Sequence, residues 1–205
     1  MSLARYISRQ LSNPSGIGGK LICSVMNVQN IPLYNETTRL LALSNTDNVL
    51  DIGCGNGYVL NMLANEYGCR FIGIDISESI IENASRRCNR FVKSNKLAFY
   101  CQNADSMSFA DNSFSKVYTI NTIYFWENLN KTMQEIWRVL KSNGVFINTL
   151  FSNETLSSFS HTKYGYKRFT VEELINTGNN LGFSINVIPI LNDTAYCILY
   201  HKVSA

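Results

Sequence analysis

The chain has 205 residues, of which 45% are hydrophobic, and a formal net charge of +3. A chain of this length buries roughly 70% of the surface that its unfolded form exposes, so we expect one domain over residues 1–205. The small net charge does not predict a nucleic acid partner. No apolar run reaches the roughly 20 residues that a membrane-spanning helix needs.

The first 47 residues are expected to form a helical cap on a core that spans residues 48–205. Residues 13–19 are rich in Gly, Ser, Asn and Pro, which predicts a flexible break between two short helices. Tyr34 lies in the second of these helices and could close over a ligand bound to the core.

From residue 48 onward, short apolar runs alternate with segments of helical periodicity. The strand-like runs are 48–52, 70–74, 97–101, 116–120 and 144–150. Between most of them, apolar residues recur at spacings of three and four, as on one face of a helix. This alternation predicts a mostly parallel sheet that helices cover on both faces.

The C-terminal part predicts one helix and a hairpin. Residues 152–169 show no periodicity, so we expect an irregular loop there. Thr170 and Glu173 have the spacing of a capping box, which predicts that a helix begins at this point. Two strand-like runs follow, at 184–190 and 195–201. Only four residues separate them, so we expect them to pair as an antiparallel hairpin.

The strongest local signal is a glycine-rich turn after the first strand. Gly53, Gly55 and Gly57 allow positive φ and a close approach of the backbone to a ligand. The turn therefore places a ligand at the carboxyl end of that strand, against the N-terminus of the next helix. A dinucleotide-binding loop is the alternative, but Tyr58 stands where its third glycine would fall.

Two acidic residues follow neighbouring predicted strands. Asp75 ends the second strand, roughly 20 residues after the first glycine, where a carboxylate can accept hydrogen bonds from ribose hydroxyls. The alternative is a cap on the following helix, although Ser77 can fill that position. Asp105 follows the third strand and could accept a hydrogen bond from an exocyclic amine. An ordinary turn aspartate is the alternative there.

The six cysteines carry no disulfide or metal-binding pattern. No pair has C-x-x-C spacing, and neither His161 nor His201 completes a set of metal ligands, so we expect no metal. We recognise no secretory signal, which favours reduced thiols in a cytoplasmic protein. Arg5 and Arg9, with no acidic residue before Glu36, leave a mitochondrial presequence as the alternative.

These residues resemble the class I S-adenosylmethionine-dependent methyltransferases, and most closely the branch with the ubiquinone and menaquinone biosynthesis enzymes. Residues 51–57 read D-I-G-C-G-N-G, like the family's D-x-G-C-G-x-G loop. Residues 105–115 are similar to D-x-x-x-L-P-F-x-D-x-S-F-D, and residues 135–141 to E-x-x-R-V-L-K. The resemblance runs from about residue 48 to residue 150. It implies a Rossmann-like, three-layer α/β sandwich whose seven-stranded, mostly parallel sheet ends in an antiparallel hairpin.

The resemblance also implies S-adenosylmethionine as the cofactor. The glycine loop would hold its methionyl part, Asp51 its amino group, Asp75 its ribose and Asp105 its adenine amino group. Ile76 would pack on the adenine ring, and Asn121 would line the methyl-transfer site. The full set of implied cofactor-binding residues is Asp51, Gly53, Cys54, Gly55, Gly57, Asp75, Ile76, Ala104, Asp105 and Asn121.

Methyl transfer requires alignment and exclusion of water more than a universal catalytic residue. A general base is needed only if the nucleophile arrives protonated. His161, in the long loop after the fifth strand, is the candidate base, with a solvated loop histidine as the alternative. Tyr124 follows the fourth strand and is the second catalytic candidate. An aromatic wall for the substrate is predicted from Tyr124, Phe125, Trp126, Tyr164, Tyr166 and Phe169.

We expect methyl transfer to a small molecule by a monomer or homodimer. Residues 121–124 read N-T-I-Y rather than the N-P-P-Y of many amino-methyltransferases, and no Pro-Cys nucleophile follows the fourth strand. Two alternatives stay open. One is a catalytically silent, methyltransferase-like binding module. The other is an NAD-dependent oxidoreductase, for which no Tyr-x-x-x-Lys occurs among the nearest tyrosines.

Overall fold

The computed structural model describes residues 2–12 and 16–203, and all of their side chains except those of residues 11–26. The helices are α1 (Leu3–Ser12), α2 (Gly16–Leu41), α3 (Tyr58–Glu66), α4 (Glu78–Arg87), α5 (Asn89–Lys93), α6 (Leu129–Val139), α7 (Asn153–Ser158) and α8 (Val171–Asn180). The 3₁₀ helices are η1 (Ile123–Phe125) and η2 (Ser160–Lys163). The strands are β1 (Asn48–Ile52), β2 (Arg70–Asp75), β3 (Leu97–Cys101), β4 (Phe114–Ile120), β5 (Leu140–Phe151), β6 (Phe183–Ile190) and β7 (Ala195–Lys202).

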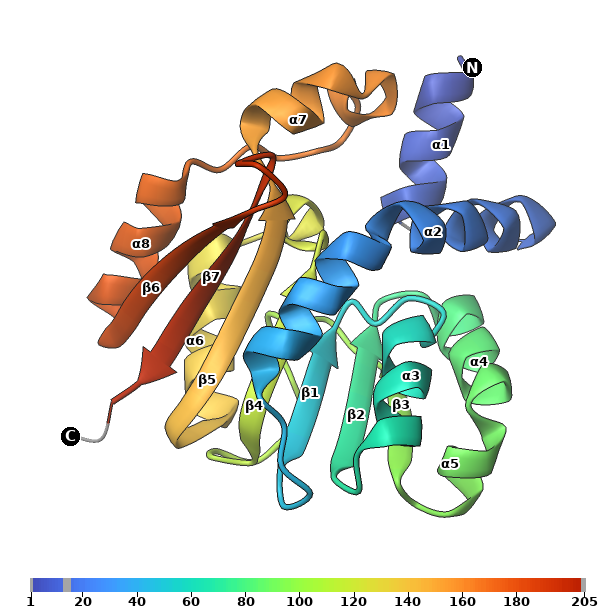
Figure 1. The fold of residues 1–205 in the computed structure, drawn as a ribbon. Helices are drawn as coiled ribbons and strands as arrows, with labels where there is room; N and C mark the ends of the chain where they lie inside the picture. The colour runs from blue at the N-terminus through green and yellow to red at the C-terminus, as the bar shows by residue number, and fades with distance from the viewer. Residues whose placement is uncertain (1, 13–15, 204–205) are drawn as a thin grey trace.

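The seven strands form one sheet in the order β3-β2-β1-β4-β5-β7-β6 (Figure 1). Strands β1 to β5 run parallel, whereas β7 pairs antiparallel with both β5 and β6. This confirms the predicted sheet and its C-terminal hairpin. The chain builds from β1 outward to β3 and then starts again in the other direction at β4. Ligands of open α/β sheets bind beyond the carboxyl ends of the strands beside such a reversal.

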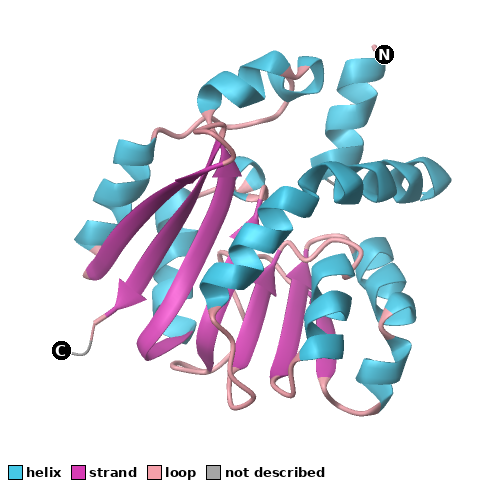
Figure 2. Cartoon of the chain, in the orientation of Figure 1, coloured by secondary structure: helices cyan, strands magenta, loops and turns pink. Residues whose placement is uncertain are grey.

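Helices cover both faces of the sheet (Figure 2). Side chains alternate along each strand, so Val49 and Leu50 of β1 belong to two separate cores on opposite faces. One core packs the sheet against α2 and α3, through residues such as Leu33 and Leu60. The other packs it against α6 and α8, through residues such as Ile136. The fold is therefore the three-layer α/β sandwich that the sequence predicts.

The N-terminal region differs from its prediction. Helix α2 begins at Gly16 and runs for 26 residues with Pro32 inside it, so the predicted break over residues 13–19 is wrong from Gly16 onward. Residues 13–15 lie outside the described part. The buried hydroxyls of Thr37 on α2 and Thr149 on β5 lie 2.7 Å apart and fix the helix to the sheet. Within the described residues, no helix is long and apolar enough to cross a membrane.

Residues 152–169 contain two short helices, α7 and η2, where the sequence predicted an irregular loop. The Ser152 hydroxyl accepts a 3.2 Å hydrogen bond from the Thr155 backbone N–H and begins α7. Helices this short carry too few apolar residues to show a period. The following helix agrees with its prediction, because Thr170 and Glu173 form both hydrogen bonds of a capping box.

Hydrogen bonds join two of the segments that resemble family motifs, residues 105–115 and residues 135–141. The guanidinium of Arg138 on α6 donates hydrogen bonds to the carboxylates of Glu135 and Asp111. It also donates to the backbone carbonyls of Met107 and Phe109. Glu135 in turn accepts a 2.8 Å hydrogen bond from the Met107 backbone N–H. The E-x-x-R segment therefore anchors the loop between β3 and β4.

Candidate active site

A cavity of about 570 Å³ opens at the carboxyl ends of β1, β2 and β4. The loops after these strands line one side of it. The middle of α2 and residues 151–166, which include α7 and η2, line the other. Figure 1 shows α7 and the N-terminal part of α2 beyond the carboxyl ends of the strands, whereas the rest of α2 crosses one face of the sheet. The cavity therefore lies at the reversal of strand order, where the glycine loop predicted a ligand.

The glycine loop is hydrogen-bonded to the end of β2 and leaves open space toward the cavity. The backbone N–H groups of Gly53 and Cys54 both donate to the carbonyl of Ile74, at 2.8 and 3.0 Å. All three loop glycines have positive φ. A Cβ on Gly55 would meet no atom within 4 Å, and Gly55 lines the cavity. Because Gly55 has no side chain, the backbone of the loop can come close to a ligand, and we call this open space at Gly55 the cradle.

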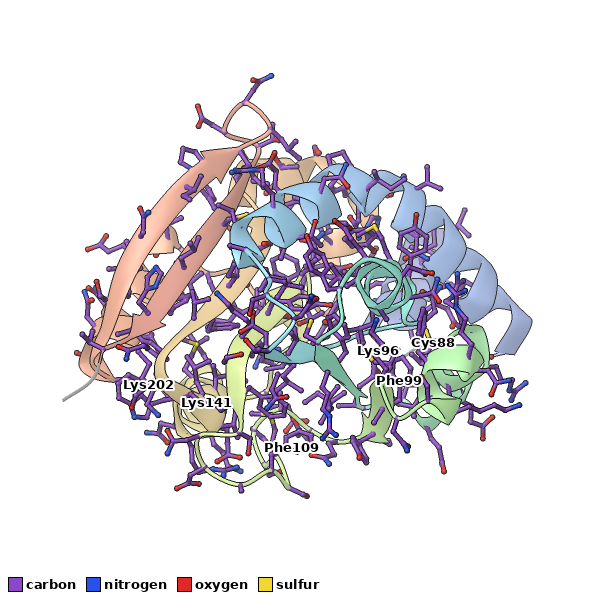
Figure 3. All side chains as sticks on the ribbon, turned by 60° about the horizontal axis from the view of Figure 1, so that its bottom comes forward. Cys88, Lys96, Phe99, Phe109, Lys141 and Lys202 are labelled. Atoms are coloured by element: carbon purple, nitrogen blue, oxygen red, sulfur yellow. The ribbon has the colours of Figure 1, made fainter. Side chains whose placement is uncertain are left out.

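The other two glycines serve packing. A Cβ on Gly53 would overlap the side chain of Thr122. A Cβ on Gly57 would lie 3.0 Å from Cζ of Phe99 and 3.3 Å from Sγ of Cys88. Phe99 on β3 and Cys88 at the end of α4 lie close together in Figure 3. Gly57 is therefore needed where α3 begins against these neighbours, and it does not line the cavity.

Asp51 is a carboxylate buried at the end of β1. It is 4% exposed, and Oδ2 accepts a 2.8 Å hydrogen bond from the hydroxyl of Tyr118. Burial raises the pKa of Asp51 to about 7, and the nearby carboxylate of Asp75 raises it as well, whereas the hydrogen bond from Tyr118 lowers it. A cationic ligand bound beside Asp51 would stabilise the ionised form of this carboxylate, so the position favours binding of a cation.

Asp75 lines the same cavity at the end of β2. Its Oδ2 accepts a 3.2 Å hydrogen bond from the Gly55 N–H, and Oδ1 accepts one of 3.0 Å from the Ser77 N–H. Burial raises the pKa of Asp75. Ser77 is the N-cap residue of α4 as expected, but its side chain makes no capping hydrogen bond. The Asp75 carboxylate thus joins the glycine loop to the start of α4 and keeps lone pairs for a ligand.

The side of the cavity next to residues 151–166 is aromatic. Tyr124, Phe125, Trp126 and Tyr166 line it as predicted, together with Phe151 and Phe159. The predicted wall residues Tyr164 and Phe169 do not line it. Instead, the Tyr164 ring packs 5.1 Å from the guanidinium carbon of Arg5 on α1. The hydroxyl of Ser8 on α1 also donates to the Tyr164 carbonyl, so α1 lies on the outside of η2.

The two catalytic candidates differ in their surroundings. The Tyr124 hydroxyl donates to Oδ1 of Asn121 at 3.1 Å and accepts from the Phe151 N–H at 2.7 Å. Burial raises the pKa of Tyr124 well above its usual range, so this group is suited to holding the wall rather than to moving a proton. His161 lines the cavity, half-buried, with its ring stacked on Phe159. Burial lowers its pKa, which keeps the imidazole neutral at pH 7.

Lys167 joins two walls of this aromatic region. Its ammonium donates to the carbonyls of Trp126 and Glu127, at 2.7 and 2.6 Å. Its backbone N–H donates to the carbonyl of Tyr124 at 3.0 Å. The loop after β4 and the segment after η2 are thereby fixed to each other.

Most of the predicted cofactor-binding residues come together on the cavity wall. Those that line it are Asp51, Gly53, Cys54, Gly55, Asp75, Ile76, Ala104 and Asn121. Gly57 and Asp105 do not. The chain turns after β3 so that Gln102, Asn103 and Ala104 face the cavity. The Asp105 carboxylate instead lies 3.9 Å from the ammonium of Lys131 on α6.

Several lining residues escaped the sequence analysis. Tyr118 was not predicted because its sequence context is that of an ordinary strand residue, although the pairing of β1 with β4 places it opposite Asp51. Asn30 on α2 belongs to no sequence motif, although its Oδ1 accepts a 3.2 Å hydrogen bond from the side chain of Asn121. Only the sheet register and the path of α2 reveal these two residues. Tyr34 lines the cavity, as its position suggested.

Comparison with known proteins points to one family. Residues 50–148 match the methyltransferase domain family. The O-methyltransferase resE of Aspergillus sclerotiorum is 31% identical over 116 residues, which cover 57% of this chain and 44% of that protein. The chain thus spans less than half of that relative. The uncharacterized methyltransferase YdaC of Bacillus subtilis is 28% identical over 140 residues, 68% of this chain and 75% of that protein.

A solved structure shows the same fold over the whole chain. It is a methyltransferase of Haloferax volcanii in complex with the Trm112 methyltransferase activator. It matches with a TM-score of 0.78 at 18% identity and covers 99% of this chain and 100% of that chain. The matching domain, the motifs in their order and the fold agree. Residues 50–148 therefore form a methyltransferase domain of the class I, S-adenosylmethionine-dependent kind.

Proposed function

We propose that this chain transfers a methyl group from S-adenosylmethionine to a small-molecule acceptor. The observation that carries the proposal is the pair of buried carboxylates, Asp51 and Asp75, on one cavity wall. No lysine or arginine lines the cavity among the residues whose side chains are described. S-adenosylmethionine carries an ammonium and a sulfonium against one carboxylate, so its net charge complements this wall. The phosphates of NAD would be repelled by it.

The chain offers a partner for each part of the cofactor. Asp51 would accept hydrogen bonds from the ammonium, and Asp75 from the ribose hydroxyls. The side chain of Ile76, an apolar residue that is 55% exposed at the cavity edge, would pack on the adenine. The open space above Gly55 would admit the methionyl chain.

When bound, S-adenosylmethionine supplies a methyl group on a sulfonium, whose sulfur leaves as a neutral thioether. The residues of this chain then have to hold the acceptor in line with that methyl group and keep water out. The α2 helix and residues 151–166 enclose the cavity on the side opposite the glycine loop. A cytoplasmic location and a monomeric or homodimeric state stay predictions.

The proposal is tested by methyl transfer from S-adenosylmethionine labelled in its methyl group. The protein is incubated with this compound and a cell extract, which is then separated by molecular size. We expect label in the low-molecular-mass fraction, and at least tenfold less with the Asp75→Ala variant when S-adenosylmethionine is kept below its dissociation constant. Label in protein or nucleic acid would contradict a small-molecule acceptor. No transfer by a protein that binds the cofactor would favour the silent binding module.

A further inference from the structure

Aromatic rings form a continuous surface on the acceptor side of the cavity. The rings of Phe125 and Tyr166 meet edge to face at 4.7 Å, and Tyr124 lies 5.5 Å from Tyr166. His161 stacks on Phe159 at 5.7 Å and lies 5.9 Å from Tyr166. A surface of rings held against each other favours a flat, apolar ligand, since offset and edge-to-face contacts with another ring are favourable.

Charge is nearly absent from this surface. Glu127, an exposed residue at the cavity edge, is the one described charged residue among the lining residues after β4. The guanidinium of Arg168 is nearby, but it donates to the hydroxyl of Thr162 at 3.1 Å and does not line the cavity. An anionic acceptor would therefore lose its hydration without gaining a described cation. An amine would enter as an ammonium ion, and one exposed carboxylate compensates that charge poorly.

We infer that the acceptor is an uncharged molecule with a planar ring system, that its nucleophile is a hydroxyl group, and that His161 takes the hydroxyl proton. The inference rests on the proposed methyl transfer and names its substrate class. A hydroxyl on an apolar ring arrives protonated, so it needs a base near the methyl group. His161 lines the cavity among these rings, and a neutral imidazole is the side chain of this surface suited to accept a proton near neutral pH.

The reaction balances without a further reactant. The hydroxyl oxygen forms a bond to the methyl carbon while the sulfur–methyl bond breaks and its electron pair returns to sulfur. The hydroxyl proton moves to the imidazole of His161 and from there to solvent. The products are a methyl ether, S-adenosylhomocysteine and one proton.

Three probes that share one ring system separate the possible acceptor charges. Naphthol is neutral, hydroxynaphthoate is an anion and naphthylmethylamine is a cation. Each is titrated by calorimetry into the full chain saturated with S-adenosylhomocysteine. We expect naphthol to bind at least tenfold more tightly than either charged probe. Equal binding, tighter binding of a charged probe, or no binding of naphthol would overturn the inference. Because aromatic rings also attract cations, naphthylmethylamine is the critical comparison.

Two variants locate the binding surface. Phe159→Leu removes a ring that is 36% exposed, so the fold should tolerate the change, and naphthol should bind at least fivefold more weakly. Phe109→Leu is the matched control, since Phe109, which is labelled in Figure 3, is a partly buried ring that does not line the cavity. S-adenosylhomocysteine should bind both variants as it binds the parent. If the parent itself did not bind S-adenosylhomocysteine, the proposed function would be refuted. Failure of the proposed function is thus distinguished from failure of the inference about the acceptor.

His161→Gln tests the base. At a naphthol concentration that saturates the variant, its methylation rate at pH 7 should be at least a hundredfold below that of the saturated parent, so a change in binding alone does not explain the loss. The rate of the variant should then rise with pH as naphtholate forms in solution, which makes the base unnecessary. Methylation at the parental rate, or a rate that does not rise with pH, would remove His161 from this role.

Discussion

The hydroxyl of Tyr118 donates a 2.8 Å hydrogen bond to the carboxylate of Asp51, and the two residues are register partners on neighbouring parallel strands. Both side chains point to the face of the sheet that α2 covers, and both are buried. The fold thus fixes an acidic group at the base of the cavity, where the amino group of the cofactor is proposed to bind. The ionisation of Asp51 should therefore control cofactor affinity.

Cofactor affinity should depend on pH through Asp51, whose pKa in the free protein is raised to about 7. A bound ammonium favours the ionised carboxylate, so binding releases a proton below pH 7. Affinity should fall by up to roughly tenfold per pH unit well below pH 7, and should level off above pH 7 for as long as the cofactor amino group stays protonated. Calorimetry from pH 5.5 to 8.5 measures this. The Asp51→Asn variant should bind weakly and without the inflection, and an inflection that survives in it would assign the effect to another group, such as Asp75.

The same raised pKa predicts a stability change of the opposite sign in the free protein. A carboxyl whose folded-state pKa lies above its unfolded value stabilises the fold at low pH, and this contribution is lost as pH rises through the folded pKa. From this group alone, the ligand-free protein should unfold more easily at pH 8 than at pH 5. Denaturant titrations of parent and Asp51→Asn at both pH values isolate the contribution. A difference between the two pH values that is the same in both proteins would contradict it.

Tyr118→Phe should weaken cofactor binding at neutral pH without removing a cofactor contact. The Tyr118 hydrogen bond lowers the pKa of Asp51, so its loss should move the inflection in affinity to higher pH. A hydrogen bond to a charged group contributes roughly 1.5–3 kcal/mol, which corresponds to a loss in affinity of about tenfold or more at pH 7. Calorimetry at pH 7 and pH 8.5 compares the variant with the parent. An unchanged inflection would show that Tyr118 does not set the ionisation of Asp51.

Two glycine variants should fail in different ways. Gly55→Ala puts a methyl group into open space, so its cost in stability is that of a positive φ, roughly 1–2 kcal/mol. Its cofactor affinity should nevertheless fall at least tenfold, because the methyl group occupies the cradle. Gly53→Ala forces a Cβ into Thr122 and should destabilise the ligand-free protein more strongly. Thermal unfolding and calorimetry separate the two effects, and normal binding by Gly55→Ala would reject the cradle.

Arg138→Met should destabilise the protein by roughly 2 kcal/mol while leaving cofactor affinity unchanged, since the guanidinium holds the loop between β3 and β4 and does not line the cavity. Denaturant unfolding and a cofactor titration test the two halves of this statement. A change in affinity larger than threefold in a folded variant would link the loop to the cavity.

Local spacing predicted the sheet and the glycine loop because both depend on neighbouring residues. All seven strands overlap the predicted runs, although β5 begins at Leu140 rather than at residue 144, and Gly55 opens to the cavity as the loop required. The residues that the sequence missed owe their positions to contacts between distant segments. Tyr118 reaches Asp51 only through the register of β1 and β4. Asp105 lies outside the cavity lining, with its carboxylate 3.9 Å from the ammonium of Lys131 on α6, a contact that no spacing along β3 indicates.

The central claim, that the acidic cavity binds S-adenosylmethionine, is tested most directly by calorimetric titration of the chain with S-adenosylmethionine, S-adenosylhomocysteine and NAD. We expect micromolar dissociation constants for the two adenosyl compounds and no measurable binding of NAD. Asp75→Ala should weaken the first two at least tenfold, roughly 1.4 kcal/mol. Binding of NAD in place of S-adenosylmethionine, or the absence of binding by any of the three, would contradict the claim.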